Sequence, residues 1–254
     1  MDRLAFNAMA AINEERLVRQ QLSNDIANVS TVGFKQTYEA TLQPNKAVGL
    51  GFDSRLQPHL YTTDQVKLEP GPLMVTGRDL DVSFNHKTVL GVTGTDGTLA
   101  FTRRGDLRVN SNGVLETGSG HIVRGQDGGP ITVPQGFRLT FGNDGSLFAT
   151  DTTQPAPQQS QLVGQLLLRD ASTTTLIKRT DGLFAVDEKP LGTDFASGNG
   201  EISLTPQALE GSAVNPMTSM VKLIEQSRSF EHQIRIIKES KSNDESGASM
   251  MRSN

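Results

Sequence analysis

Asp79 and Asp81 come closest, among the residues of this sequence, to a catalytic pair. Residues two apart in an extended strand lie on one face of it, so both carboxylates would point the same way. Neighbouring carboxylates can differ in pKa and serve as acid and base in a hydrolase. No histidine or glutamate cluster lies beside them in the sequence, and we therefore interpret them as the polar side of an edge strand.

The other patterns associated with catalysis or metal binding are absent from the sequence. The histidines are too far apart for the i, i+4 spacing of a helical metal site, and we expect them to be solvated. No Gly-x-Ser-x-Gly elbow occurs, and no glycine-rich phosphate loop is followed by Lys-Ser/Thr. The sequence thus predicts no catalytic residue, no metal and no cofactor. The histidines are His59, His86, His121 and His232.

The tripeptide Arg104-Gly105-Asp106 matches the motif of some cell-adhesion ligands. It follows Phe101-Thr102-Arg103 and precedes a candidate strand, a place where a glycine commonly turns the chain. We therefore interpret the tripeptide as a turn and not as an adhesion site.

The composition argues against nucleic-acid binding and favours a β-rich fold. The 254 residues carry 24 Lys and Arg against 28 Asp and Glu, which leaves no basic excess for nucleic acid. Glycine contributes 25 residues, aromatic residues make up 5%, and tryptophan is absent, a balance typical of turn-rich β structure. The lack of cysteine removes disulfides and thiolate sites, and it suits an oxidising compartment.

The amino terminus does not resemble a cleaved signal peptide. Asp2 stands beside Arg3, and the segment Asn13-Glu14-Glu15-Arg16 ends any apolar run. No segment approaches the about 20 apolar residues that span a bilayer. We therefore expect neither a secretory signal route nor a membrane-spanning helix.

The first thirty residues carry the pattern of a helix that packs against other helices. Apolar residues recur at steps of three or four, and Glu15 and Asp25 interrupt this stripe. Because no Gly or Pro occurs before Gly33, one helix can run for about 40 Å at 1.5 Å per residue. The expected interface residues are Leu4, Ala8, Ala11, Val18, Leu22 and Val29.

A second helix is expected near the carboxyl end. Asn215-Pro216 is a good start signal, because a proline has no amide hydrogen to lose in the first helical turn. Met217, Val221 and Ile224 form an apolar stripe beside the seam. A single such helix would be expected to pack on its own core, but one at each end favours pairing. The expected interface residues are Met220, Leu223, Phe230, Ile234 and Ile237.

Between the helices the sequence changes to short strands and turns. Asp-Gly or Asn-Gly dipeptides, which are typical of hairpins, recur at intervals of 16, 15 and 17 residues, and a fifth follows. These dipeptides are Asp96-Gly97, Asn112-Gly113, Asp127-Gly128, Asp144-Gly145 and Asp181-Gly182. The rhythm predicts a β meander, with strands expected at 107–109, 131–133, 138–141 and 183–186.

Three segments fit neither pattern. Residues 36–72 contain four prolines and are expected to form an extended connector without regular structure. Residues 151–161 are expected to form a loop rich in Pro, Gln and Thr. Residues 242–254 are small and polar apart from Met250 and Met251, which predicts a mobile tail.

The segment Ser23-Asn24-Asp25-Ile26-Ala27-Asn28-Val29-Ser30-Thr31-Val32-Gly33-Phe34-Lys35 resembles the N-terminal signature of bacterial flagellar rod and hook proteins. The core of that signature is Ala-Asn-x-x-Thr-x-Gly-Phe. It is matched here by Ala27, Asn28, Thr31, Gly33 and Phe34. Gly33 follows the helix, and we expect it to adopt a positive φ that a Cβ atom would disfavour.

Other segments extend the resemblance over most of the chain. Leu209-Glu210-Gly211-Ser212-Ala213-Val214-Asn215-Pro216, followed by Met220 and Arg228-Ser229-Phe230-Glu231, is similar to the family's C-terminal pattern. Ala213 stands where the family usually has Asn, and Ser212 or Asn215 could partly replace the lost helix cap. Gly71-Pro72-Leu73, residues 76–82 and Phe101-Thr102-Arg103-Arg104-Gly105 resemble the beginning of its β domain.

The resemblance implies an α+β fold in which the N- and C-terminal helices pair as a coiled coil, with a central all-β domain and an extended connector. It implies no cofactor. The expected parts are an N-terminal helix and signature turn, a connector, a β domain, a C-terminal helix and a flexible tail. Their ranges are 1–34, 35–75, 76–208, 209–241 and 242–254.

The resemblance also implies a structural axial subunit of the flagellar basal-body rod and not an enzyme. Such a subunit assembles helically through its terminal helices and builds the drive shaft and the wall of the export channel. The implied partners are copies of itself, other rod subunits and the flagellar export apparatus, without nucleic acid or a small-molecule substrate. The implied location is the periplasmic rod, reached by type III export without a cleaved signal.

Three alternatives remain open from the sequence. The length, the Met1-Asp2-Arg3 start and the short connector are more similar to proximal rod proteins than to the longer distal rod or hook proteins, which rank second. A secreted β-domain binding protein would be expected to expose an aromatic platform. A hydrolase would be expected to lose activity when Asp79 or Asp81 is changed.

Overall fold

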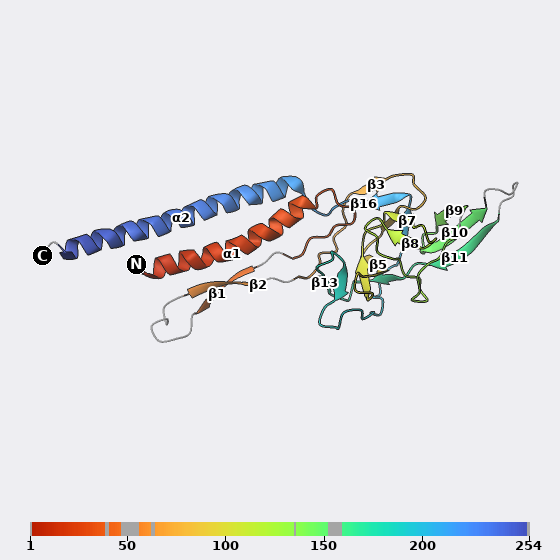
Figure 1. Ribbon diagram of the computed structural model, residues 1–254, viewed down its shortest axis with the longest axis horizontal. Helices are drawn as coiled ribbons and strands as arrows, with labels where there is room; N and C mark the ends of the chain where they lie inside the picture. The colour runs from red at the N-terminus through yellow and green to blue at the C-terminus, as the bar shows by residue number, and fades with distance from the viewer. Residues whose placement is uncertain are drawn as a thin grey trace. The chain divides into compact units, whose positions relative to one another are not determined.

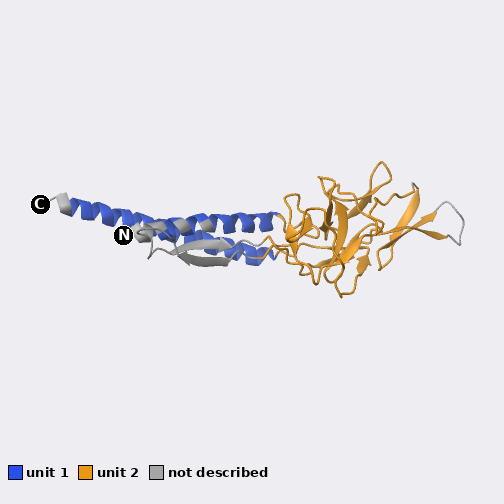
Figure 2. Ribbon diagram, turned by 90° about the horizontal axis from the view of Figure 1, so that it is seen from below, with its two compact units in different colours: residues 1–27, 39–63, 215–254 blue, residues 28–38, 64–214 orange. Residues whose placement is uncertain are grey.

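The computed structural model describes residues 2–38, 41–46, 56–61, 64–134, 136–151 and 159–252. The chain divides into two compact units, coloured separately in Figure 2. Unit 1 comprises residues 1–27, 39–63 and 215–254, and unit 2 comprises residues 28–38 and 64–214. The fold is α+β, as expected, with most of its sheets in unit 2.

Unit 1 contains the two long helices of the described chain, α1 (Asp2–Ala27) and α2 (Pro216–Arg252). Asn215 caps α2, because its Oδ1 accepts hydrogen bonds from the backbone N–H groups of Met217 (3.0 Å) and Thr218 (3.3 Å). These N–H groups have no partner within the helix itself. The start signal predicted at Asn215-Pro216 is therefore confirmed.

The two ends of α2 differ from the helix range of 209–241 expected from the sequence. Ala208–Glu210 forms strand β16, because Ala208 and Glu210 turn into the interior of unit 2 and the segment pairs with another strand. At the other end the helix continues to Arg252 through the segment predicted to be a mobile tail. Polar residues can extend a helix without a core, since each added residue gains a backbone hydrogen bond.

Within unit 1, α1 and α2 run side by side and antiparallel (Figure 1). The Gln226 side chain donates a hydrogen bond to the backbone carbonyl of Glu15, with an N···O distance of 2.7 Å. The guanidinium of Arg19 lies 5.2 Å from the centre of the Phe230 ring, within the range of a cation–π contact. These contacts join residues that are more than two hundred positions apart in the sequence.

The segment expected to be an extended connector contains regular structure. Strands β1 (Thr41–Lys46) and β2 (Leu56–Tyr61) pair antiparallel, with Pro44 opposite Pro58. Proline fits an extended backbone but has no N–H to donate, so placing both prolines on one rung confines the loss to one position of the ladder. The expected loop at 151–161 begins and ends in strands, and residues 152–158 lie outside the described residues.

Unit 2 is built, in its described residues, from five antiparallel sheets. The largest has the strand order β12-β5-β6-β14-β13, the next is β11-β10-β9, and three are pairs, β15-β4, β16-β3 and β7-β8. The strands not yet given are β3 (Leu73–Val75), β4 (Val82–Phe84), β5 (Thr88–Thr93), β6 (Leu99–Thr102), β7 (Leu107–Val109), β8 (Leu115–Thr117), β9 (Phe137–Phe141), β10 (Ser146–Asp151), β11 (Ser160–Gln165), β12 (Leu168–Asp170), β13 (Leu176–Lys178), β14 (Phe184–Val186) and β15 (Leu204–Pro206).

The Asp-Gly and Asn-Gly dipeptides form turns, as predicted. The five glycines have φ values between 74° and 85°, and each glycine N–H bonds to the carbonyl three residues before it. The residue before each glycine keeps a negative φ, so the turn is type I followed by a left-handed glycine. The prediction of a strand at 131–133 is wrong, because Thr132 makes only an isolated bridge to Val114.

The five-stranded sheet is buried on both faces. Leu90 and Ala100 belong to one hydrophobic cluster, whereas their neighbours Val89 and Phe101 belong to another. Successive strand residues point to opposite faces, so a strand between two cores needs an apolar residue at nearly every position. Neither helix in the described part of the chain combines the length and apolar character needed to cross a membrane.

Candidate functional site

A buried ionic cluster, which we call the clasp, joins Lys35, Arg103 and Glu210 in unit 2. The Lys35 ammonium lies 2.7 Å from Glu210 Oε1, and Arg103 Nε lies 2.7 Å from Glu210 Oε2. The exposed fractions of the three side chains are 0%, 1% and 3%, respectively. Two cations therefore share one carboxylate out of contact with solvent.

The rest of the Arg103 guanidinium holds the turn between β4 and β5. Its Nη1 donates to the carbonyls of His86 (2.7 Å) and Thr88 (3.1 Å), and its Nη2 donates to that of Phe84 (2.5 Å). His86 has a φ of 48°, a left-handed conformation that is strained for a residue with a side chain. Arg103 thus fixes a strained turn while its charge is balanced by Glu210.

Backbone groups complete the hydrogen bonding of Lys35 and Glu210. Lys35 also donates to the carbonyl of Glu69, and Glu210 Oε1 also accepts the N–H of Gly71 at 2.8 Å. Burial, followed by the neighbouring charge of Arg103, lowers the pKa of Lys35, and Glu210 opposes this effect. The carboxylate is therefore what keeps the ammonium charged in the interior.

Gly33 brings the N-terminal segment close enough to the clasp to complete it. Its N–H donates to the backbone carbonyl of Glu210 at 2.8 Å, and its φ is 67°, which confirms the predicted positive value. A Cβ atom at this position would lie 2.3 Å from the carbonyl oxygen of Arg103. Only glycine fits both the backbone conformation and the close approach.

The clasp gathers segments that the sequence analysis described separately. Lys35 ends the segment 23–35, Arg103 lies in 101–105, Glu210 lies in 209–216, and Gly71 opens 71–73. The sequence analysis identified these segments but did not predict that their charged residues form one ionic cluster. The available signal was Glu210, a charged residue that shares the buried side of β16 with Ala208. Every charged group of the clasp is paired and buried, so the arrangement can hold segments together but offers no free acid, base or nucleophile.

The comparisons with known proteins agree with this reading of the segments. Residues 88–149 match the flagellar hook protein FlgE/F/G D1 domain, and residues 205–250 match the flagellar basal body rod FlgEFG protein C-terminal family. The flagellar basal-body rod protein FlgF of Salmonella typhimurium is 33% identical over 239 residues, with 93% of each chain covered. FlgF of Escherichia coli is 30% identical over the same coverage, whereas FlgG of Bacillus subtilis is 27% identical over 85% of this chain.

This chain belongs to the flagellar basal-body rod protein family, FlgF type. It is a structural subunit of the proximal rod in the flagellar basal body. The FlgG proteins matched are each 27% identical to this chain, less than the two FlgF proteins above, so the distal-rod alternative is less well supported.

The signature residues of the rod protein come directly before Lys35, the first residue of the clasp. Ala27 is the last residue of α1. The Thr31 N–H and hydroxyl both bond to Asn28, at its carbonyl and its side-chain oxygen, which closes a turn. The Lys178 ammonium lies 4.1 Å from the centre of the Phe34 ring. The signature therefore builds the turn that delivers Lys35 to Glu210.

The interface residues predicted for the two helices fall into different environments. On α1, Ala8 and Leu22 are buried and Ala11 and Val18 are half-buried, as is Val29 beyond the helix, whereas the Leu4 side chain lies outside the described residues. On α2, Met220 is exposed, and four residues are half-buried, namely Leu223, Phe230, Ile234 and Ile237.

Asp79 and Asp81 do not form an acid–base pair. Asp79 lies in a turn and not in a strand, where it accepts hydrogen bonds from Arg138 (2.7 Å) and Gln207 (2.8 Å). The bond from Arg138 lowers the pKa of Asp79. Asp81 is buried and lies 3.3 Å from Arg78. The expectation that both lie on one strand face is wrong, because the strand begins only at Val82.

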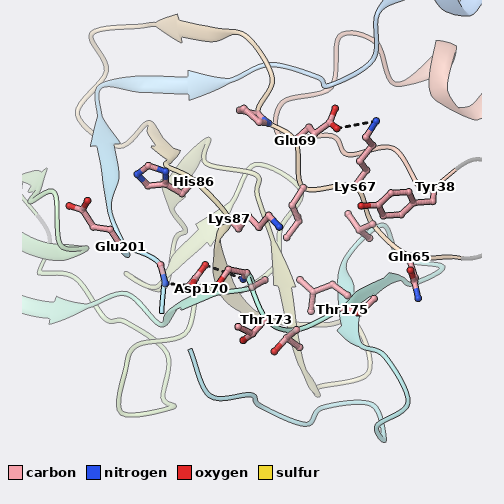
Figure 3. Close-up of a pocket in the computed structure, with 18 residues that line it drawn as sticks. Tyr38, Gln65, Lys67, Glu69, His86, Lys87, Asp170, Thr173, Thr175 and Glu201 are labelled. Carbon is pink, nitrogen blue, oxygen red and sulfur yellow. Dashed lines mark hydrogen bonds and ion pairs between the residues drawn. The ribbon is translucent and has the colours of Figure 1, made fainter. Parts of the chain in front are cut away.

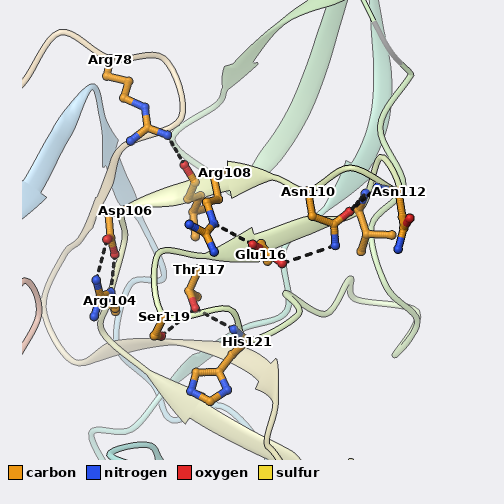
Figure 4. A network of polar contacts seen from close by, with 12 residues as sticks. Arg78, Arg104, Asp106, Arg108, Asn110, Asn112, Glu116, Thr117, Ser119 and His121 are labelled. Carbon is orange, nitrogen blue, oxygen red and sulfur yellow. Dashed lines mark hydrogen bonds and ion pairs between the residues drawn. The ribbon is translucent and has the colours of Figure 1, made fainter.

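The tripeptide Arg104-Gly105-Asp106 is closed on itself, as Figure 4 shows. Arg104 Nε and Nη2 donate to the two carboxylate oxygens of Asp106 at 2.6 and 2.8 Å. Gly105 is buried, and a Cβ there would lie 1.8 Å from the carbonyl oxygen of Val82. The motif is thus a packed segment between β6 and β7 to which no turn is assigned, so the turn expected from the sequence is not found, and its Arg and Asp are paired with each other.

The histidines lie on separate elements wherever the structure describes them. His86 occupies the turn between β4 and β5, His121 follows β8, and His232 lies on α2, whereas the His59 side chain is outside the described residues. No group of three or more potential ligands for a metal ion occurs among the described residues.

An open groove of about 910 Å³ lies on unit 2, with His86 and Lys87 on its wall (Figure 3). Asp170 on its floor is engaged by the hydroxyl of Ser172 (2.5 Å) and the N–H of Gly200 (2.7 Å). The carboxylate that faces the groove is therefore already used to hold the surrounding loops.

Proposed function

We propose that this rod protein assembles helically with copies of itself and with other rod subunits through the faces of α1 and α2. In this proposal the helices pair as a coiled coil and together build the drive shaft and the wall of the export channel. The subunit is passed outward by the flagellar export apparatus and takes its place in the periplasmic rod. The names of its relatives, which are basal-body rod proteins, support this assignment.

The observation that carries the proposal is an apolar stripe on α2 that is exposed in the part of the chain that the structure describes. The stripe consists of Met217, Met220, Val221 and Ile224, whose exposed fractions are 73%, 52%, 54% and 54%. These residues recur at steps of three, one and three, which places them on one side of a helix. A concentrated exposed apolar surface of this kind marks a site of protein interaction.

The stripe faces away from α1. At about 100° per residue, Gln226, Ser229 and Gln233 lie on the opposite side of α2, and all three donate hydrogen bonds to Glu15. Beyond Ile224 the side that carries the stripe becomes charged. The apolar surface is therefore confined to the first two turns of α2 and is free for a neighbouring subunit.

The half-buried residues of α2 support the pairing of the two helices. Phe230 contacts Arg19 of α1, and Leu223 and Ile237 lie seven residues before and after Phe230 on the same side of the helix. An aspartate at Leu223 or Ile234 would place a charge against α1, and we expect either change to block assembly while unit 2 stays folded.

The stripe is tested by Ile224→Asp, with Ser227→Asp as the matched control. Both changes add one carboxylate to an exposed position within one turn of the same helix, but only the first lies in the stripe. Swimming assays and the amount of the chain in purified basal bodies are the readouts, and circular dichroism checks folding. We expect Ile224→Asp to abolish incorporation and Ser227→Asp to retain it. Normal incorporation of a folded Ile224→Asp chain would refute the proposal.

A further inference from the structure

Glu15 of α1 is engaged by two turns of α2. The hydroxyl of Ser229 and the amide of Gln233 donate to its Oε1 at 2.5 and 2.8 Å, and Gln226 donates to its backbone carbonyl at 2.7 Å. The three donors follow one another at steps of three and four, which aligns them on one face of α2. The carboxylate thus holds Ser229 and Gln233, and the backbone carbonyl of the same residue holds Gln226 one turn earlier on α2.

Glu15 occupies a place in α1 where an apolar residue would be expected. The residues Ala8, Ala11, Val18 and Leu22 are buried or half-buried, and Glu15 continues their steps of three and four. A carboxylate in such a seam stabilises a helix pair less than a leucine would, because it must be removed from water. Its presence therefore calls for a reason other than stability.

The facing side of α2 carries polar residues in a matching pattern. Ser219, Gln226, Gln233 and Ser240 recur at intervals of seven, and the two serines are buried. Between them, again at intervals of seven, come Leu223, Phe230 and Ile237. Polar and apolar layers thus alternate along the side of α2 that faces α1.

We propose that Glu15 fixes the register in which α1 and α2 pair, acting as a positioning residue. This inference rests on the proposed pairing of the helices. Three oxygen atoms of the cluster, Glu15 Oε2, Gln226 Oε1 and Gln233 Oε1, are buried with no hydrogen-bond partner among the described residues. A cluster that leaves acceptors unsatisfied is not optimised for stability, whereas polar groups in a helical seam are well suited to select one register.

A shift of the helices shows what Glu15 selects against. Moving α1 by one turn seats the carboxylate beside Gln226, between Leu223 and Phe230, or beside Gln233, between Phe230 and Ile237, so that one glutamine takes the place of the two donors Ser229 and Gln233. Moving it by seven residues exchanges one glutamine for Ser219 or Ser240, and Ser229 for Lys222 or Ile236. Only the observed register gives Glu15 both glutamines and Ser229.

The register can be measured with spin labels, because the chain has no cysteine and labels can be attached to introduced ones. Labels at Gln20 on α1 and Glu239 on α2 occupy exposed positions of the full-length chain that lie far apart along the helix axes, so a slide of one helix along the other changes their separation. Electron–electron double resonance should give one narrow distance. In Glu15→Leu we expect a second population displaced by up to about 5 Å, the rise of one helical turn, with an unchanged or higher melting temperature.

Two variants separate positioning from a general structural effect. Glu15→Gln keeps an acceptor oxygen for Ser229 and should retain the single distance, and Arg16→Leu adds the same apolar side chain at an exposed neighbouring position and should retain it too. A single unchanged distance in Glu15→Leu would overturn the inference. A broad distribution in the unaltered chain would also overturn it, because unpaired helices have no register, whereas the stripe on α2 is judged separately by incorporation into rods.

Discussion

Replacing Glu210 by glutamine tests whether the clasp holds unit 2 together. The substitution keeps the shape of the side chain but removes the negative charge, so Lys35 and Arg103 remain buried without a counter-ion. Removing one partner of a buried ion pair typically costs about 3–5 kcal/mol. A domain has only about 5–15 kcal/mol of stability in total, so we expect a loss of roughly a fifth or more.

Urea unfolding followed by circular dichroism measures this loss in the purified chain. The melting temperature should fall by about 6–20 °C, given about 2–4 °C per kcal/mol for a domain of this size. Glu201→Gln is the matched control, because Glu201 is an exposed glutamate of the same unit and should leave stability unchanged. A Glu210→Gln chain within about 1 kcal/mol of the unaltered protein would refute the reasoning.

A double substitution shows whether the loss comes from the uncompensated charges. Lys35→Met removes one of the two cations and keeps most of the side-chain length. If burial of unpaired charge is the cause, adding Lys35→Met to Glu210→Gln should cost less than the sum of the two single changes. Additive losses would mean that the two residues act independently.

Three further outcomes are expected. Gly33→Ala should destabilise the chain far more than Gly77→Ala in urea unfolding, because both glycines have a positive φ but only Gly33 has a backbone atom where the Cβ would go. Asp79→Asn should leave swimming unchanged, since its salt bridge is exposed; loss of motility in a folded chain would revive a chemical role. Hydrogen bonds from Thr98 lower the pKa of Asp96 from 3.8 to about 2, so the stabilising effect of its carboxylate should persist above pH 4 and disappear between pH about 4 and 2; an NMR titration midpoint near 3.8 would contradict this.

Local chemistry in the sequence determined the features that need only neighbouring residues. Asn215-Pro216 specified the start of α2, because the Asn side chain satisfies N–H groups two and three residues away. The Asp-Gly and Asn-Gly dipeptides specified the turns, because glycine adopts a left-handed conformation at little cost. Gly33 belongs to the same class, since its positive φ was predictable from its place after a helix.

Features that depend on distant partners were decided by the tertiary structure. The pairing of β1 with β2 and the end of α2 were not predicted, because strand formation depends on a partner and helix extension depends on a continuing backbone ladder. The clasp is the clearest case. Lys35 and Glu210 are 175 positions apart, and no local pattern in the sequence states which buried cation meets which carboxylate. Their pairing follows only once the chain has brought both segments into one interior, where a charge without a partner is strongly destabilising.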